Sequence, residues 1–248
     1  MATDEVKQVV ATNRTRPGKQ TEGVDNYLRS SRYKELVTYP MDLAGYAEEG
    51  SFYLAANATR GTGLGGQTAP TDLTLDTKAL LYIQNTMTDA NGDYLVLKYV
   101  RLQVTVAGTA GTNTSWADEI DVGATDRYTS GGTLLTVVGA NTDLTQAATA
   151  RIRFGILVTA AASASRRNLG SGVVRTAIAV VGDTYLFVYG KDTMPLSSML
   201  VAGTAVANIV IPRPPVVLGP QDQYLLHFAN ASQTAAASYE VEIGYVQR

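Results

Sequence analysis

Alternation of apolar and polar residues with a period of two is the feature that most constrains this chain, and it is clearest near the C-terminus. Residues 223–228 and 239–246 each place every second side chain on one face, as β-strands do. In the second run Tyr239, Val241, Ile243 and Tyr245 form an apolar face, opposite an acidic face that is expected to meet solvent. Because small polar residues separate the runs, we expect two antiparallel strands joined by a loop, the second completing a sheet.

Similar runs recur from residue 51 onward and predict about ten strands. These runs are residues 51–55, 79–84, 94–106, 116–122, 133–138, 151–158, 173–181, 184–189 and 206–211. Asn91-Gly92 and Gly182-Asp183 predict hairpin turns between the strands that flank them.

The sequence also predicts which segments lie at sheet edges and which connect the strands. Residues 94–106 and 116–122 are expected at sheet edges, and residues 126–132 and 160–172 are expected to be exposed connections. The proline-rich residues 211–215 predict an unpaired crossover, since proline fixes φ and lacks an N–H donor.

These patterns predict an all-β fold, an antiparallel β-sandwich of jelly-roll type over residues 51–248. A doubly wound α/β fold is excluded, because no predicted helix is long enough for a crossover between parallel strands. Residues 1–50 are expected to form an extended, partly helical N-terminal arm, with one short helix within residues 25–36.

Charge and cysteine content exclude several classes of partner and of chemistry. The chain has 248 residues, of which 20 are basic and 22 acidic, so its net charge of −2 favours neither nucleic acid nor an anionic membrane surface as a partner. It has no cysteine, which excludes disulfides and thiolate chemistry. No stretch approaches the roughly 20 apolar residues of a membrane span, and we expect synthesis in a cytoplasm without a secretory signal.

Two motifs suggest cofactors or metals. Gly61-x-Gly63-x-x-Gly66 matches the dinucleotide fingerprint by letter, but Pro70 follows where a helix should begin, so we expect a plain glycine-rich loop and no cofactor. The densest acidic patch comprises Asp118, Glu119, Asp121 and Asp126. This patch is a calcium candidate through its oxygen ligands, or else a solvated acidic rim.

Catalytic candidates are few, and we predict no catalytic residue and no enzymatic activity. His227 is the only histidine and is expected to lie on a sheet surface without a catalytic role. Glu240 and Glu242 share a strand face, as a glycosidase pair could, but neighbouring positions on one strand do not face each other across a cleft. A solvated face is the preferred interpretation.

Two features indicate interaction surfaces. Arg14, Arg16 and Lys19 lie in the polar residues 1–24, which form either a disordered terminus or an arm that becomes ordered by gripping a neighbouring subunit. Fourteen tyrosines accompany only four phenylalanines, and tyrosine suits both subunit interfaces and sugar-binding surfaces.

Residues 126–133, the segment Pro214-Pro215-Val216-Val217 and the closing residues 240–245 give the chain a resemblance to virion structural proteins of tailed bacteriophages. The resemblance lies in the organisation and composition of most of the chain: a polar arm, then a cysteine-free, Ala/Thr/Gly-rich all-β domain. It implies a head decoration (cement) protein, commonly a homotrimer, with the major capsid protein as partner on the virion surface.

Three functions follow as hypotheses. In the first, the chain decorates and stabilises the outside of a phage head, with residues 1–50 as the anchor. In the second, it is a receptor- or glycan-binding domain of a phage tail fibre or spike. The third is a capsule-degrading hydrolase, and the shell protein of the capsid itself is a further alternative.

Overall fold

The structure is a computed structural model that describes residues 43–48, 50–67, 78–88, 92–123, 126–143, 147–159, 165–190 and 206–248. The chain divides into two units, Met1–Phe52 with Gly139–Gln146, and Tyr53–Val138 with Ala147–Arg248. The expected helix within residues 25–36 lies outside the described residues. The first unit contains helix α1 (Leu43–Glu48), which was not predicted because six residues are too few to show a helical period.

Helix α1 ends at a glycine. Gly50 has a φ of 73°, a left-handed conformation that glycine adopts without a steric cost. The amide of Gly50 donates to the carbonyl of Ala47, and the amide of Ser51 donates to the carbonyl of Tyr46. These two bonds satisfy carbonyls that the end of a helix leaves without a partner.

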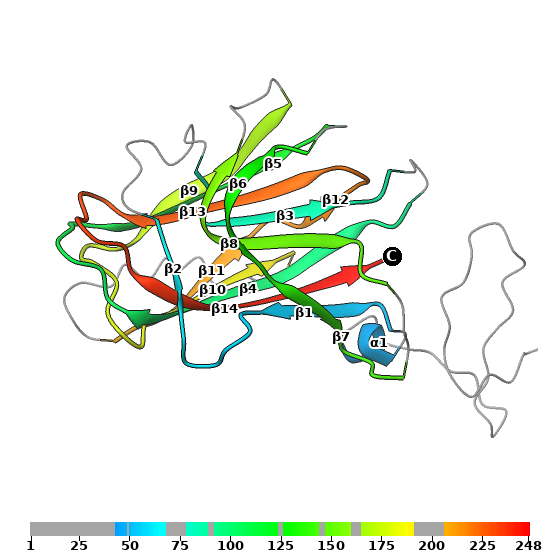
Figure 1. Cartoon of the computed structure of the whole chain (residues 1–248), viewed down its shortest axis with the longest axis horizontal. Helices are drawn as coiled ribbons and strands as arrows, with labels where there is room; N and C mark the ends of the chain where they lie inside the picture. Colours follow the sequence, from blue (N-terminus) through cyan, green and yellow to red (C-terminus); the bar gives the residue numbers. More distant parts are fainter. Residues whose placement is uncertain are drawn as a thin grey trace, which may run out of the picture. The chain divides into compact units, whose positions relative to one another are not determined.

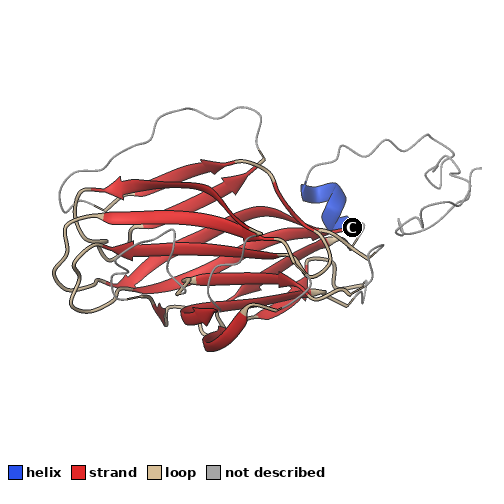
Figure 2. Cartoon of the chain, turned by 90° about the horizontal axis from the view of Figure 1, so that it is seen from above, coloured by secondary structure: helices blue, strands red, loops and turns tan. Residues whose placement is uncertain are grey.

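The second unit is a β-sandwich, in which strands are the main secondary structure (Figure 2). The strands are β1 (Phe52–Ala56), β2 (Leu64–Gly65), β3 (Leu81–Asn85), β4 (Leu95–Val106), β5 (Thr114–Asp121), β6 (Tyr128–Leu134), β7 (Thr136–Gly139), β8 (Ala150–Thr159), β9 (Arg166–Arg175), β10 (Thr184–Tyr189), β11 (Asn208–Arg213), β12 (Val216–Leu218), β13 (Gln223–Asn230) and β14 (Ser238–Gln247). The predicted all-β sandwich is therefore confirmed.

Two sheets form the layers of this sandwich (Figure 1). The first sheet has the order β11-β10-β4-β14-β1-β7, with β12 also paired to β4 and β2 to β14. The second sheet has the order β6-β8-β3-β13-β5-β9. Neighbours in these sheets form a nested series, in which β1 lies beside β14, β3 beside β13, β4 beside β10, and β5 beside β9.

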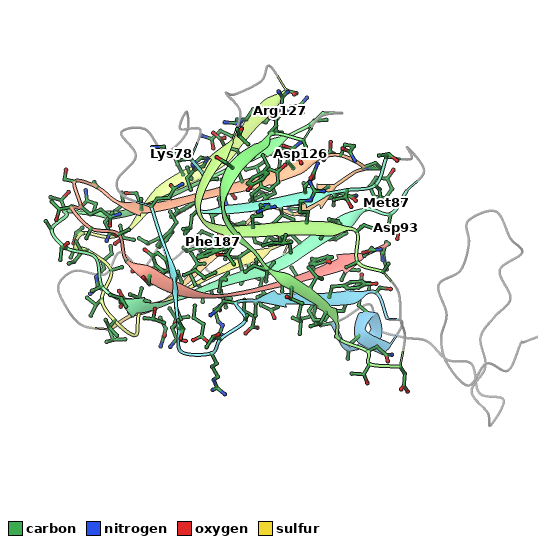
Figure 3. All side chains as sticks on the ribbon, in the orientation of Figure 1. Lys78, Met87, Asp93, Asp126, Arg127 and Phe187 are labelled. Atoms are coloured by element: carbon green, nitrogen blue, oxygen red, sulfur yellow. The ribbon has the colours of Figure 1, made fainter. Side chains whose placement is uncertain are left out.

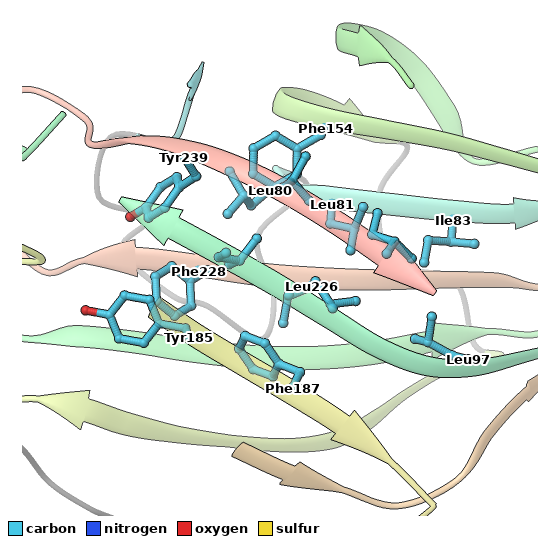
Figure 4. Close-up of a cluster of buried hydrophobic side chains, with 14 of the residues drawn as sticks. Leu80, Leu81, Ile83, Leu97, Phe154, Tyr185, Phe187, Leu226, Phe228 and Tyr239 are labelled. Carbon is cyan, nitrogen blue, oxygen red and sulfur yellow. The ribbon is translucent and has the colours of Figure 1, made fainter. Parts of the chain in front are cut away.

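The core lies between the sheets, and the period-two pattern identified much of it correctly (Figure 4). The predicted inward rows are buried on β4 (Val100, Leu102, Val104), β13 (Tyr224, Leu226, Phe228) and β14 (Tyr239, Val241, Ile243, Tyr245). Val106, which the pattern places in the β4 row, is instead 57% exposed at the end of that strand. Aromatic rings interlock across the layers: the Phe187 centroid lies 6.1 Å from that of Phe228 and 5.9 Å from that of Trp116. Each such fully buried side chain contributes about 1.5–3 kcal/mol through burial.

The apolar run at the start of β4 is explained by a β-bulge. The pairing of β4 with β14 shifts by one residue between Gly244 and Tyr245, so that Gly244 opposes Tyr99 while Tyr245 opposes Leu97. The extra residue, Lys98, changes which alternate side chains of β4 point toward the core. Leu97 and Val100 are therefore both buried although they are three positions apart.

The predicted hairpins are wrong, because strands that follow one another in sequence belong to different sheets. The predicted Asn91-Gly92 turn falls between β3 and β4, with Asn91 itself outside the described residues, and the turn at Gly182-Asp183 lies between β9 and β10. The two C-terminal runs, β13 and β14, also separate into the second and first sheets. Glycine-containing turns show where the chain reverses, but they do not determine whether the next strand pairs with the previous one.

Several predicted edges and loops are also corrected. Strand β4 lies between β10 and β14, and β5 lies between β13 and β9, so both are central. The expected connections at residues 126–132 and 160–172 contain the edge strands β6 and β9. The expected crossover at residues 211–215 contains the end of β11, which pairs in parallel with β10 through Arg213. Pro212 is tolerated there because β11 is an edge strand.

Candidate functional site

The predicted calcium ligands lie on or just after β5, and the structure divides them between its two faces. Asp118 points into the space between the sheets, where its carboxylate lies 3.4 Å from the Tyr224 hydroxyl. Glu119 and Asp121 lie on the outer face of the second sheet, within 4 Å of guanidinium groups. Asp126 follows the strand and pairs with Arg151. The four carboxylates therefore do not converge on one point.

Asp118 is part of an ion pair buried inside the sandwich. Arg213 donates from Nε to Oδ2 at 2.8 Å and from Nη2 to Oδ1 at 2.6 Å, and its guanidinium carbon lies 4.3 Å from the centroid of the Trp116 ring. Burial raises the pKa of Asp118, and the hydrogen bonds from Arg213 offset part of that rise. This pair connects β5 of one sheet to β11 of the other.

The outer face of the second sheet carries a mostly buried set of ionisable side chains, here called the outer charged cluster: Glu119, Asp121, Arg127, Arg166 and His227. Glu119 Oε2 lies 3.5 Å from Arg166 Nη1 and 3.6 Å from His227 Nε2. Asp121 Oδ2 lies 3.3 Å from Arg127 Nε. Each carboxylate thus faces a cation, which is the arrangement that buried carboxylates require.

His227 is not at the sheet surface as predicted, since it is fully buried. Its Nδ1 lies 3.1 Å from the carbonyl oxygen of Lys78. Both faces of β13 are buried, so the alternating pattern of this strand did not indicate an exposed side. The imidazole is a packed member of the outer charged cluster.

Asp126 organises a second polar group, which we call the tyrosine–arginine group: Tyr82, Asp126, Tyr128, Arg151 and Arg153. Asp126 accepts hydrogen bonds from the Tyr82 hydroxyl at 2.6 Å, the Tyr128 amide at 2.9 Å and Arg151 at 2.7 Å. The guanidinium carbon of Arg153 lies 4.0 Å from the Tyr128 ring centroid, as in a cation–π contact. Asp126 and Arg127 lie beyond the second sheet, whereas Phe187 lies between the sheets (Figure 3).

Glu240 and Glu242 share a face of β14, as predicted, but each has its own contact. Glu242 pairs with Arg101 at 2.7 Å and accepts a hydrogen bond from the Tyr99 hydroxyl at 2.7 Å. Glu240 accepts a hydrogen bond from the Gly61 amide at 3.2 Å. Because the two carboxylates bind different partners, they do not face a common position at which a substrate could lie between them.

The glycine-rich motif has a packing role. A Cβ added to Gly66 would lie 2.8 Å from the Ala237 carbonyl oxygen and 2.7 Å from the Tyr239 ring. A Cβ added to Gly63 would collide with the Thr105 hydroxyl. Glycine is therefore required because β2 and the residues around it approach β14 and β4 closely.

Sequence reasoning missed a further buried ion pair, Arg175 with Asp183. Both side chains are fully buried, and Arg175 Nη1 lies 2.9 Å from Asp183 Oδ2. The carboxylate also accepts from the amides of Val180 and Ala207, both at 2.8 Å. Arg175 ends an apolar segment and Asp183 follows a glycine, so each resembles an ordinary turn residue and no local signal couples them.

The remaining features suggested by the sequence either lie outside the described residues or form no site within them. Arg14, Arg16 and Lys19 precede the described residues. Within the described ranges, no three His, Cys, Asp or Glu side chains are placed so that they could hold a metal ion together. A search of the same part of the chain for a helix long and apolar enough to cross a membrane finds none.

Comparison with known proteins identifies no relative. No protein-family model matches the chain, and no curated protein or solved structure matches it either. Function must therefore be inferred from the fold and its side chains.

Proposed function

We propose that the sandwich is of the jelly-roll type. A jelly roll is an antiparallel sandwich of eight strands with two Greek keys. The nested series described above, β1 with β14 through to β5 with β9, is the pairing of one long hairpin whose paired strands have rolled into two sheets. In this proposal β6 and β8 extend the second sheet, and β11 and β12 extend the first.

We further propose that the chain is a non-enzymatic virion structural protein, a homotrimeric decoration (cement) protein on the outside of a phage head. The observation that carries this proposal is the nested strand order, because jelly rolls are common in viral capsid proteins. The buried ion pairs add support, because they give the polar groups of the sandwich structural partners and stiffen the domain that would project from the particle.

The proposed mechanism is burial of subunit contacts. Residues 1–50 act as the anchor, with Arg14, Arg16 and Lys19 facing acidic loops of the major capsid protein. A trimer presents three anchors at once, which multiplies weak single contacts into stable attachment. The protein is made in the host cytoplasm and acts on the capsid surface.

Sedimentation with phage heads tests this proposal. Full-length chain is mixed with heads prepared without it, and the fraction that pellets is measured beside light scattering of the free protein. Reversing the arm charges (Arg14→Glu, Arg16→Glu, Lys19→Glu) should abolish pelleting. In the control variant the charges of two exposed residues of the sandwich are reversed (Arg60→Glu and Arg167→Glu), and pelleting should be unchanged. If the unaltered chain does not pellet with heads at any ratio, the decoration proposal is wrong.

The tyrosine–arginine group favours a second candidate, a receptor- or glycan-binding domain of a tail fibre or spike. Jelly rolls also occur as lectins, and sugars bind to aromatic faces beside charged hydrogen-bonding groups. Arg151 is 43% exposed at its side chain and Asp126 is 33% exposed, so ligands could reach both. A glycan array with Tyr128→Ala tests this candidate, with Tyr94→Ala as the control because Tyr94 is exposed and lies outside the group.

A further inference from the structure

The tyrosine–arginine group contains one more cation than its carboxylate neutralises. Arg151 pairs with Asp126, and its Nη1 lies 2.7 Å from Asp126 Oδ2. Arg153 has no carboxylate partner among the described residues, and its guanidinium carbon lies against the Tyr128 ring. The Arg153 Nε is buried and has no hydrogen-bond partner in the part of the chain that the structure describes. A buried donor of this kind indicates an acceptor that comes from outside the group.

Asp126 has one acceptor position left. Its Oδ1 accepts from the Tyr82 hydroxyl at 2.6 Å and from the Tyr128 amide at 2.9 Å, and its Oδ2 accepts from Arg151. A carboxylate has about four acceptor positions on its two oxygens. Burial and the hydrogen bond to Asp126 raise the pKa of Tyr82, so this hydroxyl keeps its proton and remains a donor. Because the Asp126 side chain is 33% exposed, a hydroxyl donor from solvent has access to the carboxylate.

Tyr128 brings the unneutralised cation and the available acceptor together. Its amide donates to Asp126, and its ring lies 4.0 Å from the guanidinium carbon of Arg153. Arg151 and Arg153 lie on the same face of β8, because alternate residues of a strand share a face. The group therefore presents guanidinium donors and a carboxylate acceptor on one side of the second sheet.

We propose that the tyrosine–arginine group binds a saccharide that carries a carboxylate, with that carboxylate on Arg153 and a sugar hydroxyl on Asp126. This inference rests on the glycan-binding candidate above and names the class of glycan. A guanidinium group presents parallel N–H donors that match the two oxygens of a carboxylate. Because Arg153 already lies over the Tyr128 ring, that ring offers less surface for stacking by a neutral sugar.

An acidic side chain of a protein partner matches this group less well. It would supply a carboxylate for Arg153 but no hydroxyl donor, so Asp126 would meet the ligand as a like charge without a hydrogen bond. A sugar acid supplies the carboxylate and the hydroxyl donors on one small ring. The combination of a cation and an acceptor therefore favours the sugar.

An array of matched glycans tests the inference with the full chain. Each acidic member, such as an oligogalacturonide or a sialylated oligosaccharide, is printed beside its neutral counterpart, with the carboxylate reduced or the acidic sugar removed. At least one acidic glycan should bind about tenfold or more tightly than its counterpart, as expected for a hydrogen bond to a charged group. Polyglutamate on the same array should bind more weakly than that glycan.

Substitution of Arg153 tests whether this group is the site. Arg153→Gln should weaken binding of the acidic glycan by about tenfold or more. Arg60→Gln makes the same change of charge at an exposed residue outside the group and should leave binding unchanged. Arg153→Lys keeps the charge but lacks the planar pair of donors, so it should also weaken binding. Circular dichroism of all three variants confirms that they are folded.

The possible results separate this inference from the function on which it rests. Equal binding of acidic and neutral glycans, equal binding of polyglutamate, or unchanged binding in Arg153→Gln would each overturn the inference. If neutral glycans bind and acidic ones do not, the acidic ligand class is wrong and the glycan-binding candidate stands. If no glycan of either kind binds, both are wrong.

Discussion

Removing the charge of Asp183 should destabilise the protein more than any surface substitution. The carboxylate accepts hydrogen bonds from the Arg175 guanidinium, the Tyr185 hydroxyl and two backbone amides, and it links β9 of the second sheet to β10 and the start of β11 in the first. In Asp183→Asn the Arg175 guanidinium stays fully buried but loses its counter-charge. Breaking a buried pair in this way costs about 3–5 kcal/mol.

That cost is a large share of the total stability of about 5–15 kcal/mol expected for a folded domain. For a chain of this size each kcal/mol lowers Tm by about 2–4 °C, so the expected decrease is about 6–20 °C. Urea unfolding monitored by circular dichroism measures the same loss as a lower midpoint with an unchanged m-value.

A double variant separates the lost counter-charge from lost packing. Arg175→Met combined with Asp183→Asn removes both charges, and buried pairs replaced by apolar groups are often tolerated. The double variant should therefore be more stable than Asp183→Asn alone. The reasoning is refuted if Asp183→Asn costs less than about 1 kcal/mol, the size of one ordinary hydrogen bond, or if the double variant is the less stable of the two.

Three further predictions concern pH, packing and metal. Burial raises the pKa of the core tyrosines Tyr185, Tyr189, Tyr224, Tyr239 and Tyr245, so their contribution to stability is present below about pH 10 and is lost as pH rises further. Ionisation of all fourteen tyrosines should therefore appear only together with loss of the circular dichroism signal, and full tyrosinate absorbance in a chain that keeps that signal would contradict this. Gly66→Ala should cost about 1–3 kcal/mol by overpacking, whereas Gly65→Ala, whose Cβ would meet nothing within 4 Å, serves as the control. Calcium or a chelator should leave Tm unchanged, because the β5 carboxylates already face cations; a rise in Tm with calcium would show that they rearrange around the ion.

The candidate site shows where sequence reasoning fails. The acidic patch on β5 was visible in the sequence, but the partners that define its chemistry come from elsewhere: Arg213 lies on β11, Arg166 on β9 and His227 on β13. A run of carboxylates on a strand looks the same whether it faces solvent or guanidinium groups. Only the sheet order determines which of these it is.

By itself, the sequence determined that the chain is all-β, where most strands lie and which side chains face the core. These properties follow from the period of two, because alternation is local to a strand and needs no knowledge of its neighbours. The tertiary structure alone decided which sheet each strand joins, which strands lie at the edges and which charges meet. Asp118 and Arg213 pair across 95 positions of sequence, and β13 and β14 separate although one short loop joins them. Such choices depend on the burial of whole sheets against each other, an energy that no short segment carries.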